Sequence, residues 1–172
     1  MNRDHYSADH FVKTFVALSA CFGMRLWDQE HAFSILSVAW RMIAKGENIN
    51  PFILATLLVL KISNEEIYGK LVDGELRTAE LIGIINEHST GRTFLETNCG
   101  FVLEAYLYVS LESRINIDAK IEEFKDNSNV AGIKPSLESK WRIVSDIYND
   151  GGHQRELKKI IHGLEMTKQF VN

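Results

Sequence analysis

Residues 51–60 read PFILATLLVL, an uninterrupted stretch without a charged side chain. A membrane-spanning helix needs roughly 20 such residues, so this run is only about half the required length. Asn50 can accept hydrogen bonds from the backbone at the start of a helix, and proline is well tolerated in the first turn. We therefore predict a core helix that starts at Phe52 and ends near Ile62.

Apolar residues recur at intervals of three and four along most of the remaining chain, a spacing typical of amphipathic helices. Residues 101–112 are ambiguous because Val, Tyr and Phe also favour strands, but a lone strand would have no partner. Further helices are predicted over residues 8–22, 28–46, 64–72, 78–87, 101–112, 117–124, 136–150 and from 153 onward.

Helix boundaries follow from capping residues and glycines. Gly23 is expected to end the first helix, and Asp28 is the expected N-cap of the second. Ser63 and Glu66 have the spacing of a capping box, which predicts that a helix starts there. These signals divide the chain into short helices joined by tight turns.

The second helix is apolar on almost every face, which predicts that it is the central one. Its expected main stripe is Phe33, Leu36, Trp40 and Ile43, with further apolar residues on its other faces. A helix that is apolar all round is normally surrounded by neighbours. On this basis the other helices should pack around it.

The predicted fold class is all-α: a single compact multi-helix domain of eight or nine helices, with no alternation of strands and helices. Residues 1–126 are expected to form the main bundle and residues 127–135 a loop or hinge rich in residues that break regular structure. Residues 136–172 are expected to form a C-terminal helical hairpin on the bundle.

Composition limits the possible functions. The chain has 172 residues and a net charge of −4, and its basic residues are interleaved with acidic ones, so nucleic-acid binding is not indicated. Cys21 and Cys99 lie in apolar contexts and are expected to be buried, which fits a reducing cytoplasm. No signal peptide or transmembrane segment is expected.

The sequence lacks the motifs of common catalytic chemistry. Gly69-Lys70 is followed by Leu71 instead of Ser or Thr, so it is not a phosphate-binding loop. The six histidines do not form a metal-binding pattern, and Cys21 has no nearby base. We therefore expect no catalytic residue, no metal and no cofactor.

The segment MRLWDQEH, residues 24–31, places several charged residues at the start of the apolar second helix. Asp28 and Glu30 suit the positive end of the helix dipole. Dipole and capping do not account for Arg25 or Trp27, which leaves two interpretations: capping with a packed tryptophan, or a surface that contacts a partner. The candidate interaction residues are Arg25, Trp27, Asp28 and Glu30.

This segment, followed by a long apolar helix, resembles the helical C-terminal part of the KAP family of P-loop NTPases, as does GLEMTKQFV at residues 163–171. The resemblance covers most of the chain. KAP proteins commonly have Arg directly before the Asp, whereas Trp27 holds that place here. The resemblance implies a helical region without its phosphate-binding motor, in a bacterial or mobile-element defence setting.

Three functions remain open from the sequence. The first is a non-catalytic module that binds another protein or the parent ATPase core. The second is a free-standing helical adaptor or inhibitor that acts as a decoy. The third is a small enzyme with a pocket lined by His10, Glu30 and His31. The first is the preferred hypothesis.

Overall fold

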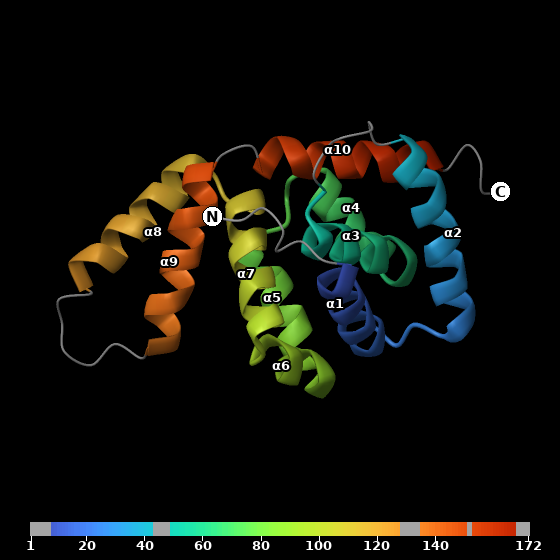
Figure 1. The fold of residues 1–172 in the computed structure, drawn as a ribbon, viewed down its shortest axis with the longest axis horizontal. Helices are drawn as coiled ribbons and strands as arrows, with labels where there is room; N and C mark the ends of the chain where they lie inside the picture. The colour runs from blue at the N-terminus through green and yellow to red at the C-terminus, as the bar shows by residue number, and fades with distance from the viewer. Residues whose placement is uncertain (1–7, 43–48, 128–134, 151–152, 168–172) are drawn as a thin grey trace.

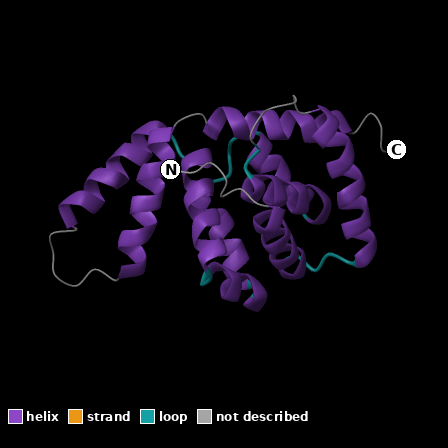
Figure 2. Ribbon diagram, in the orientation of Figure 1, coloured by secondary structure: helices purple, strands orange, loops and turns teal. Residues whose placement is uncertain are grey.

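The computed structural model describes residues 8–42, 49–127, 135–150 and 153–167, and every regular element in these ranges is a helix (Figures 1 and 2). Ten helices are present there: α1 Ala8–Cys21, α2 Leu26–Met42, α3 Pro51–Ser63, α4 Glu65–Val72, α5 Thr78–Glu87, α6 Ser89–Leu95, α7 Asn98–Leu111, α8 Arg114–Asn127, α9 Pro135–Asp150 and α10 His153–Met166. The all-α prediction is confirmed. Helix α6 was not predicted, so the count exceeds the expected eight or nine.

The centre of the fold is α3, not α2. Each residue from 51 to 60 is buried, and α3 packs against α1, α2, α4, α7 and α10. The one hydroxyl in this run, on Thr56, donates a hydrogen bond to the Phe52 carbonyl at 2.8 Å. With no other polar side chain over nearly three turns, α3 can be covered on all sides.

The prediction that α2 is central is wrong. Its buried residues include Ala32, Ile35 and Ala39, whereas Phe33 and Trp40 of the predicted main stripe are 48% and 60% exposed. Small residues on the inner face let α2 lie close to α3 and α10. The large aromatic residues therefore lie toward the outside.

The start of α3 has the predicted cap at Asn50, and the helix begins at Pro51, one residue before the predicted Phe52. The side chain of Asn50 accepts hydrogen bonds from the backbone N–H groups of Phe52 at 2.9 Å and Ile53 at 3.1 Å. Pro51 occupies the first helical position, where its missing N–H needs no partner. The backbone N–H of Asn50 donates to the carboxylate of Glu156 on α10, which ties the helix start to a distant part of the chain.

The predicted capping box of α4 is wrong by one residue. Ser63 still belongs to α3, and its hydroxyl donates back to the Val59 carbonyl at 2.7 Å. Asn64 is the N-cap of α4, and its side chain accepts the Ile67 N–H at 3.1 Å. Glu66 forms an ion pair with Lys70 at 3.1 Å instead of reaching back to the cap.

The ambiguous segment 101–112 lies within α7 except for its last residue, so the choice of a helix is confirmed. The helix starts after Thr97, whose hydroxyl accepts the Gly100 N–H at 3.1 Å. Leu103 and Leu107 are buried, and Tyr106 stacks on Phe52 with ring centroids 5.8 Å apart. The aromatic residues that suggested a strand are thus used to pack α7 against α3.

The last two helices diverge from each other. Helix α9 packs against α7 and α8, whereas α10 packs on α2, α3 and α7 and runs along one long edge of the molecule (Figure 1). Within residues 136–150 and 153–167 they therefore do not form the mutually packed hairpin that was predicted for residues 136–172. Residues 128–134 of the predicted hinge at 127–135 lie outside the described residues.

Candidate interaction surface on helix α2

A helix-ending motif positions the segment MRLWDQEH. Gly23 has a φ of +67°, a left-handed conformation that suits glycine, and the Met24 N–H donates to the Ser19 carbonyl at 2.9 Å. Together with the bond from Gly23 N–H to the Ala20 carbonyl, these contacts form a Schellman-type C-cap. The predicted end of α1 at Gly23 is confirmed, and the chain turns here into α2.

Asp28 stabilises the start of α2, but it is not the N-cap. The helix begins at Leu26, and the Arg25 carbonyl accepts the first intrahelical bond from the Gln29 N–H at 3.1 Å. The Asp28 carboxylate reaches back and accepts the Arg25 N–H at 2.8 Å. It therefore supplies the returning half of a capping box from the third helical position.

The side chain of Gln29 makes a second contact around this turn. Its amide donates to the Met24 carbonyl at 3.3 Å, and Met24 itself is buried in the core. The first turn of α2 is thus fixed to the preceding loop by Asp28 on one side and Gln29 on the other. A fixed backbone holds the neighbouring side chains in a defined place.

Trp27 is 78% exposed and Leu26 is 72% exposed, so the interpretation of a packed tryptophan is wrong. Arg25 and Glu30 are also exposed, and Asp28 is half-buried. Capping explains Asp28 alone. The structure therefore brings Arg25, Trp27 and Glu30 to the surface around one helix start, with Asp28 in a supporting role.

The exposed side of α2 continues beyond its first turn. Ser34 and Ser37 donate their hydroxyls to the carbonyls of Glu30 at 3.0 Å and Ser34 at 2.9 Å, so neither side chain projects far. Phe33 packs partly on Phe15 of α1, with ring centroids 5.2 Å apart, and Trp40 is exposed one heptad further on. Phe33 and Trp40 were predicted to lie in the core, so they were not predicted as surface residues.

The proposed enzymatic pocket receives no support from its residues. His10 lies against Phe52 of α3, with ring centroids 5.2 Å apart, whereas Glu30 and His31 are exposed on α2. Within the described ranges, no group of three or more His, Cys, Asp or Glu side chains is arranged to hold a metal ion.

The cysteines have different environments. Cys21 is buried, with its sulfur 3.8 Å from the Ile85 carbonyl, and burial raises the pKa of its thiol. A raised thiol pKa makes Cys21 a poor nucleophile near neutral pH, consistent with a packing role. Cys99 is only half-buried, so the expectation that both are buried is confirmed for Cys21 alone.

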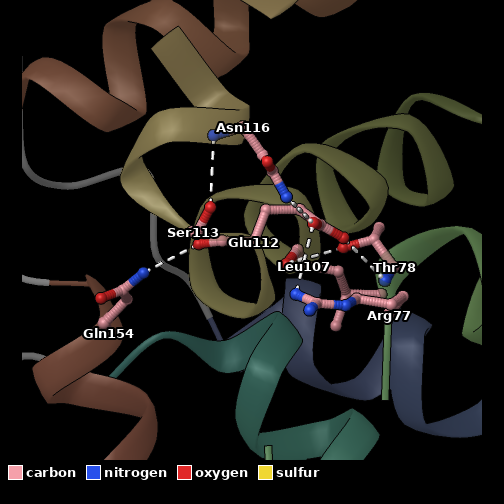
Figure 3. Close-up of polar contacts among 7 residues, drawn as sticks. All are labelled: Arg77, Thr78, Leu107, Glu112, Ser113, Asn116 and Gln154. Atoms are coloured by element: carbon pink, nitrogen blue, oxygen red, sulfur yellow. Dashed lines mark hydrogen bonds and ion pairs between the residues drawn. The ribbon is translucent and has the colours of Figure 1, made fainter. Parts of the chain in front are cut away.

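Glu112, a buried residue that was not predicted as a site, joins four helices through its carboxylate and its backbone carbonyl. Glu112 directly follows α7, and its two oxygens accept the Thr78 N–H at 3.2 Å and the Asn116 side-chain amide at 3.3 Å (Figure 3). Arg77 lies 3.8 Å from the same carboxylate, and Gln154 donates to the Glu112 carbonyl at 2.8 Å. An acidic residue is unfavourable at the C-terminus of a helix because of the helix dipole. The position of Glu112 was therefore a sequence signal that its side chain binds groups from another helix.

A second polar cluster attaches α10 to the core. The Glu165 carboxylate accepts hydrogen bonds from Lys61 at 2.8 Å and from the Tyr68 hydroxyl at 2.9 Å. The Lys61 ammonium lies 5.0 Å from the centroid of the Tyr68 ring. Burial, and then the hydrogen bond and charge of Glu165, raise the pKa of Tyr68 well above its ordinary value. This cluster links α3, α4 and α10.

Both polar clusters connect helices to one another, whereas the outer side of α2 is exposed, so we take the outer side of α2 as the candidate site. None of the helices in the described ranges has the length and apolar character needed to cross a membrane. Comparisons with family models, with curated proteins and with solved structures each found no match.

Proposed function

We propose that this chain is a non-catalytic helical module that binds another protein through the first turn of α2. The observation that carries the proposal is the 78% exposure of Trp27 on a helix start whose backbone is fixed by Asp28 and Gln29. Tryptophan and arginine are the residues most enriched at the energetic centres of protein interfaces. Arg25 and Trp27 supply both types within three residues of the chain.

The proposed partner is an ATPase core of the KAP type. This part of the proposal depends on the resemblance of residues 24–31 and 163–171 to the helical region of that family, and on the absence of a phosphate-binding loop from the sequence. In this view the chain serves as the helical region of such an ATPase, acting in bacterial or mobile-element defence in the cytoplasm. Any hydrolysis would take place on the partner.

The proposal is tested with the double variant Arg25→Glu with Trp27→Ala and a purified KAP-type ATPase core. We expect binding to weaken at least about tenfold, as for loss of an interface hot spot. The thermal midpoint should shift by less than about 2 °C, because neither side chain is part of the core. Binding is measured by calorimetry and stability by thermal unfolding.

A matched control is Ile115→Ala, which removes another large apolar side chain, 79% exposed, from α8. This control should leave binding unchanged. Unaltered binding of the double variant would refute the proposed surface. A fall in stability of several kcal/mol would instead place Arg25 and Trp27 in the fold.

A further inference from the structure

Three apolar side chains form a line along α2: Leu26, Phe33 and Trp40, which are 72%, 48% and 60% exposed. They are spaced seven residues apart, and seven residues of an α-helix turn about 700°, which is about 20° short of two full turns. Each side chain therefore lies only about 20° around the helix axis from the one before it. The line is about 21 Å long at 1.5 Å per residue. We call it the α2 stripe.

We propose that the α2 stripe binds a second copy of this chain, with the two α2 helices antiparallel about a two-fold axis at Phe33. A two-fold interface uses the same patch on both subunits, so the patch must be complementary to itself. The α2 stripe meets this condition in the antiparallel direction. Phe33 then contacts its symmetry mate, and Leu26 of each copy faces Trp40 of the other.

The sizes of these residues favour the antiparallel over the parallel direction. A small residue opposite a large one keeps two helices evenly spaced. In a parallel pair Trp40 would face Trp40 at one end and Leu26 would face Leu26 at the other. The helices would then be held apart at one end and leave a gap at the opposite end.

Charges beside the stripe are complementary in the same arrangement. Glu30 and Arg41 are exposed on the same flank of the stripe, and neither forms an ion pair with a described residue. In an antiparallel pair this flank meets the same flank of the other copy. Glu30 of one copy and Arg41 of the other are then offset by about 7.5 Å along the axis, a distance that these two long side chains can span. Symmetry creates two such pairs.

The residues between the apolar and charged groups leave room for close approach. Ser37 lies next to the stripe on the flank of Glu30 and Arg41, and its hydroxyl is bonded back to the helix. A small side chain in this place allows the second helix to approach. It also leaves no unpaired hydroxyl to be buried there.

The available area indicates a weak dimer. Aromatic side chains bury about 150–250 Å² each when fully covered. The exposed parts of the three stripe residues would therefore supply roughly 300–400 Å² of the about 800 Å² per subunit found in standard interfaces. Flanking residues must provide the rest, so we expect dissociation constants in the micromolar range or weaker.

The dimer surface shares Glu30 with the proposed partner surface but does not use Arg25 or Trp27. Trp27 is one residue beyond Leu26 and therefore lies about 100° around the helix from the stripe. The two surfaces share the helix but point in different directions. Loss of one does not require loss of the other.

The test is sedimentation equilibrium of the full chain between about 1 and 300 μM, a range that brackets the expected affinity. The average mass should rise with concentration from the monomer value of 19.6 kDa toward twice that value. Trp40→Gln should weaken association at least about tenfold. A mass that stays at the monomer value throughout, or a dimer unaffected by Trp40→Gln, would overturn the proposal.

Charge reversal tests the direction of the helices. Glu30→Arg alone and Arg41→Glu alone should each weaken the dimer by about five- to tenfold, and the combined swap should restore it to within about threefold. Lys158→Glu, an exposed reversal on α10, is the matched control and should have no effect. Failure of the double swap to restore the dimer would overturn the antiparallel arrangement.

Binding of the ATPase core to the Arg25 and Trp27 variant is measured separately, so failure of either proposal is recognised on its own.

Discussion

Helices α2 and α3 are both rich in apolar residues, yet one lies at the surface and the other at the centre. In α3 every residue from 51 to 60 is buried, whereas α2 exposes Leu26, Trp27, Phe33 and Trp40. The difference lies in the polar residues. Over the same length α3 has only Thr56, while α2 has charged residues and serines spread over about half of its circumference. The polar positions, more than the number of apolar ones, decide which helix can be enclosed.

The largest expected effect comes from a cavity in α3. Leu58 is fully buried, so Leu58→Ala removes packing on all sides and should lower the free energy of unfolding by about 2–5 kcal/mol. Urea denaturation followed by circular dichroism measures this change. A loss below about 1 kcal/mol would show that α3 is less enclosed than the comparison with α2 requires.

The next effect compares how much the N-terminal caps of α3 and α2 contribute to stability. Asn50→Ala removes an acceptor for two backbone N–H groups in a buried site and should reduce stability by about 1–2 kcal/mol. Asp28→Ala removes one such bond from a half-buried site and should reduce stability by only about 0.5 kcal/mol. The same denaturation experiment compares both variants. An equal or larger loss of stability for Asp28→Ala would contradict the conclusion that α3, and not α2, is the central helix.

A third effect depends on pH and concerns the contact between Tyr68 and Glu165, which attaches α10 to the core. The pKa of Tyr68 is raised in the folded chain, so above pH 10 the unfolded chain loses this proton first and stability falls as pH rises. This loss of stability should reach about 1 kcal/mol near pH 11 and be absent below about pH 9. Tyr68→Phe should therefore lose less stability than the unmodified chain between pH 9 and pH 11.

The two proteins differ only at residue 68, so the difference between the two pH profiles isolates Tyr68. Parallel profiles over this range would mean that Tyr68 titrates alike in the folded and unfolded chain. Free energies of unfolding from urea titrations at several pH values provide the measurement.

Local sequence signals predicted most helices correctly. Asn50-Pro51, Gly23 and the spacing of Leu81 and Ile85 act within a few residues of the elements that they define, so α1, α3 and α5 could be placed from the sequence. The short α6 was missed because its seven residues include two threonines and a glycine and lack a clear apolar period. Its Gly91 is buried where a side chain would collide with the Ile85 carbonyl, which no local pattern reveals.

The candidate site was predicted only in part. The exposure of Arg25 and Glu30 follows from their charge, and their position follows from the helix start. The exposure of Phe33 and Trp40 depends on which face of α2 meets its neighbours, and small residues such as Ala32 and Ala39 decided that. Side-chain size along the face is a weaker sequence signal than hydrophobicity, so the larger residues were assigned to the wrong side.

The contacts of Glu112 with Thr78, Asn116 and Gln154 affect the way the molecule unfolds. The Glu112 carboxylate is withdrawn from water only when α5, α7 and α8 have met, and Gln154 adds α10 to the same point. A buried charge without its hydrogen-bond donors is strongly unfavourable. A partly assembled set of helices around Glu112 is therefore less stable than either the fully packed or the fully separated state. The segments that meet there should therefore separate together, as one cooperative unit, and their backbone amides should exchange with solvent at a common rate.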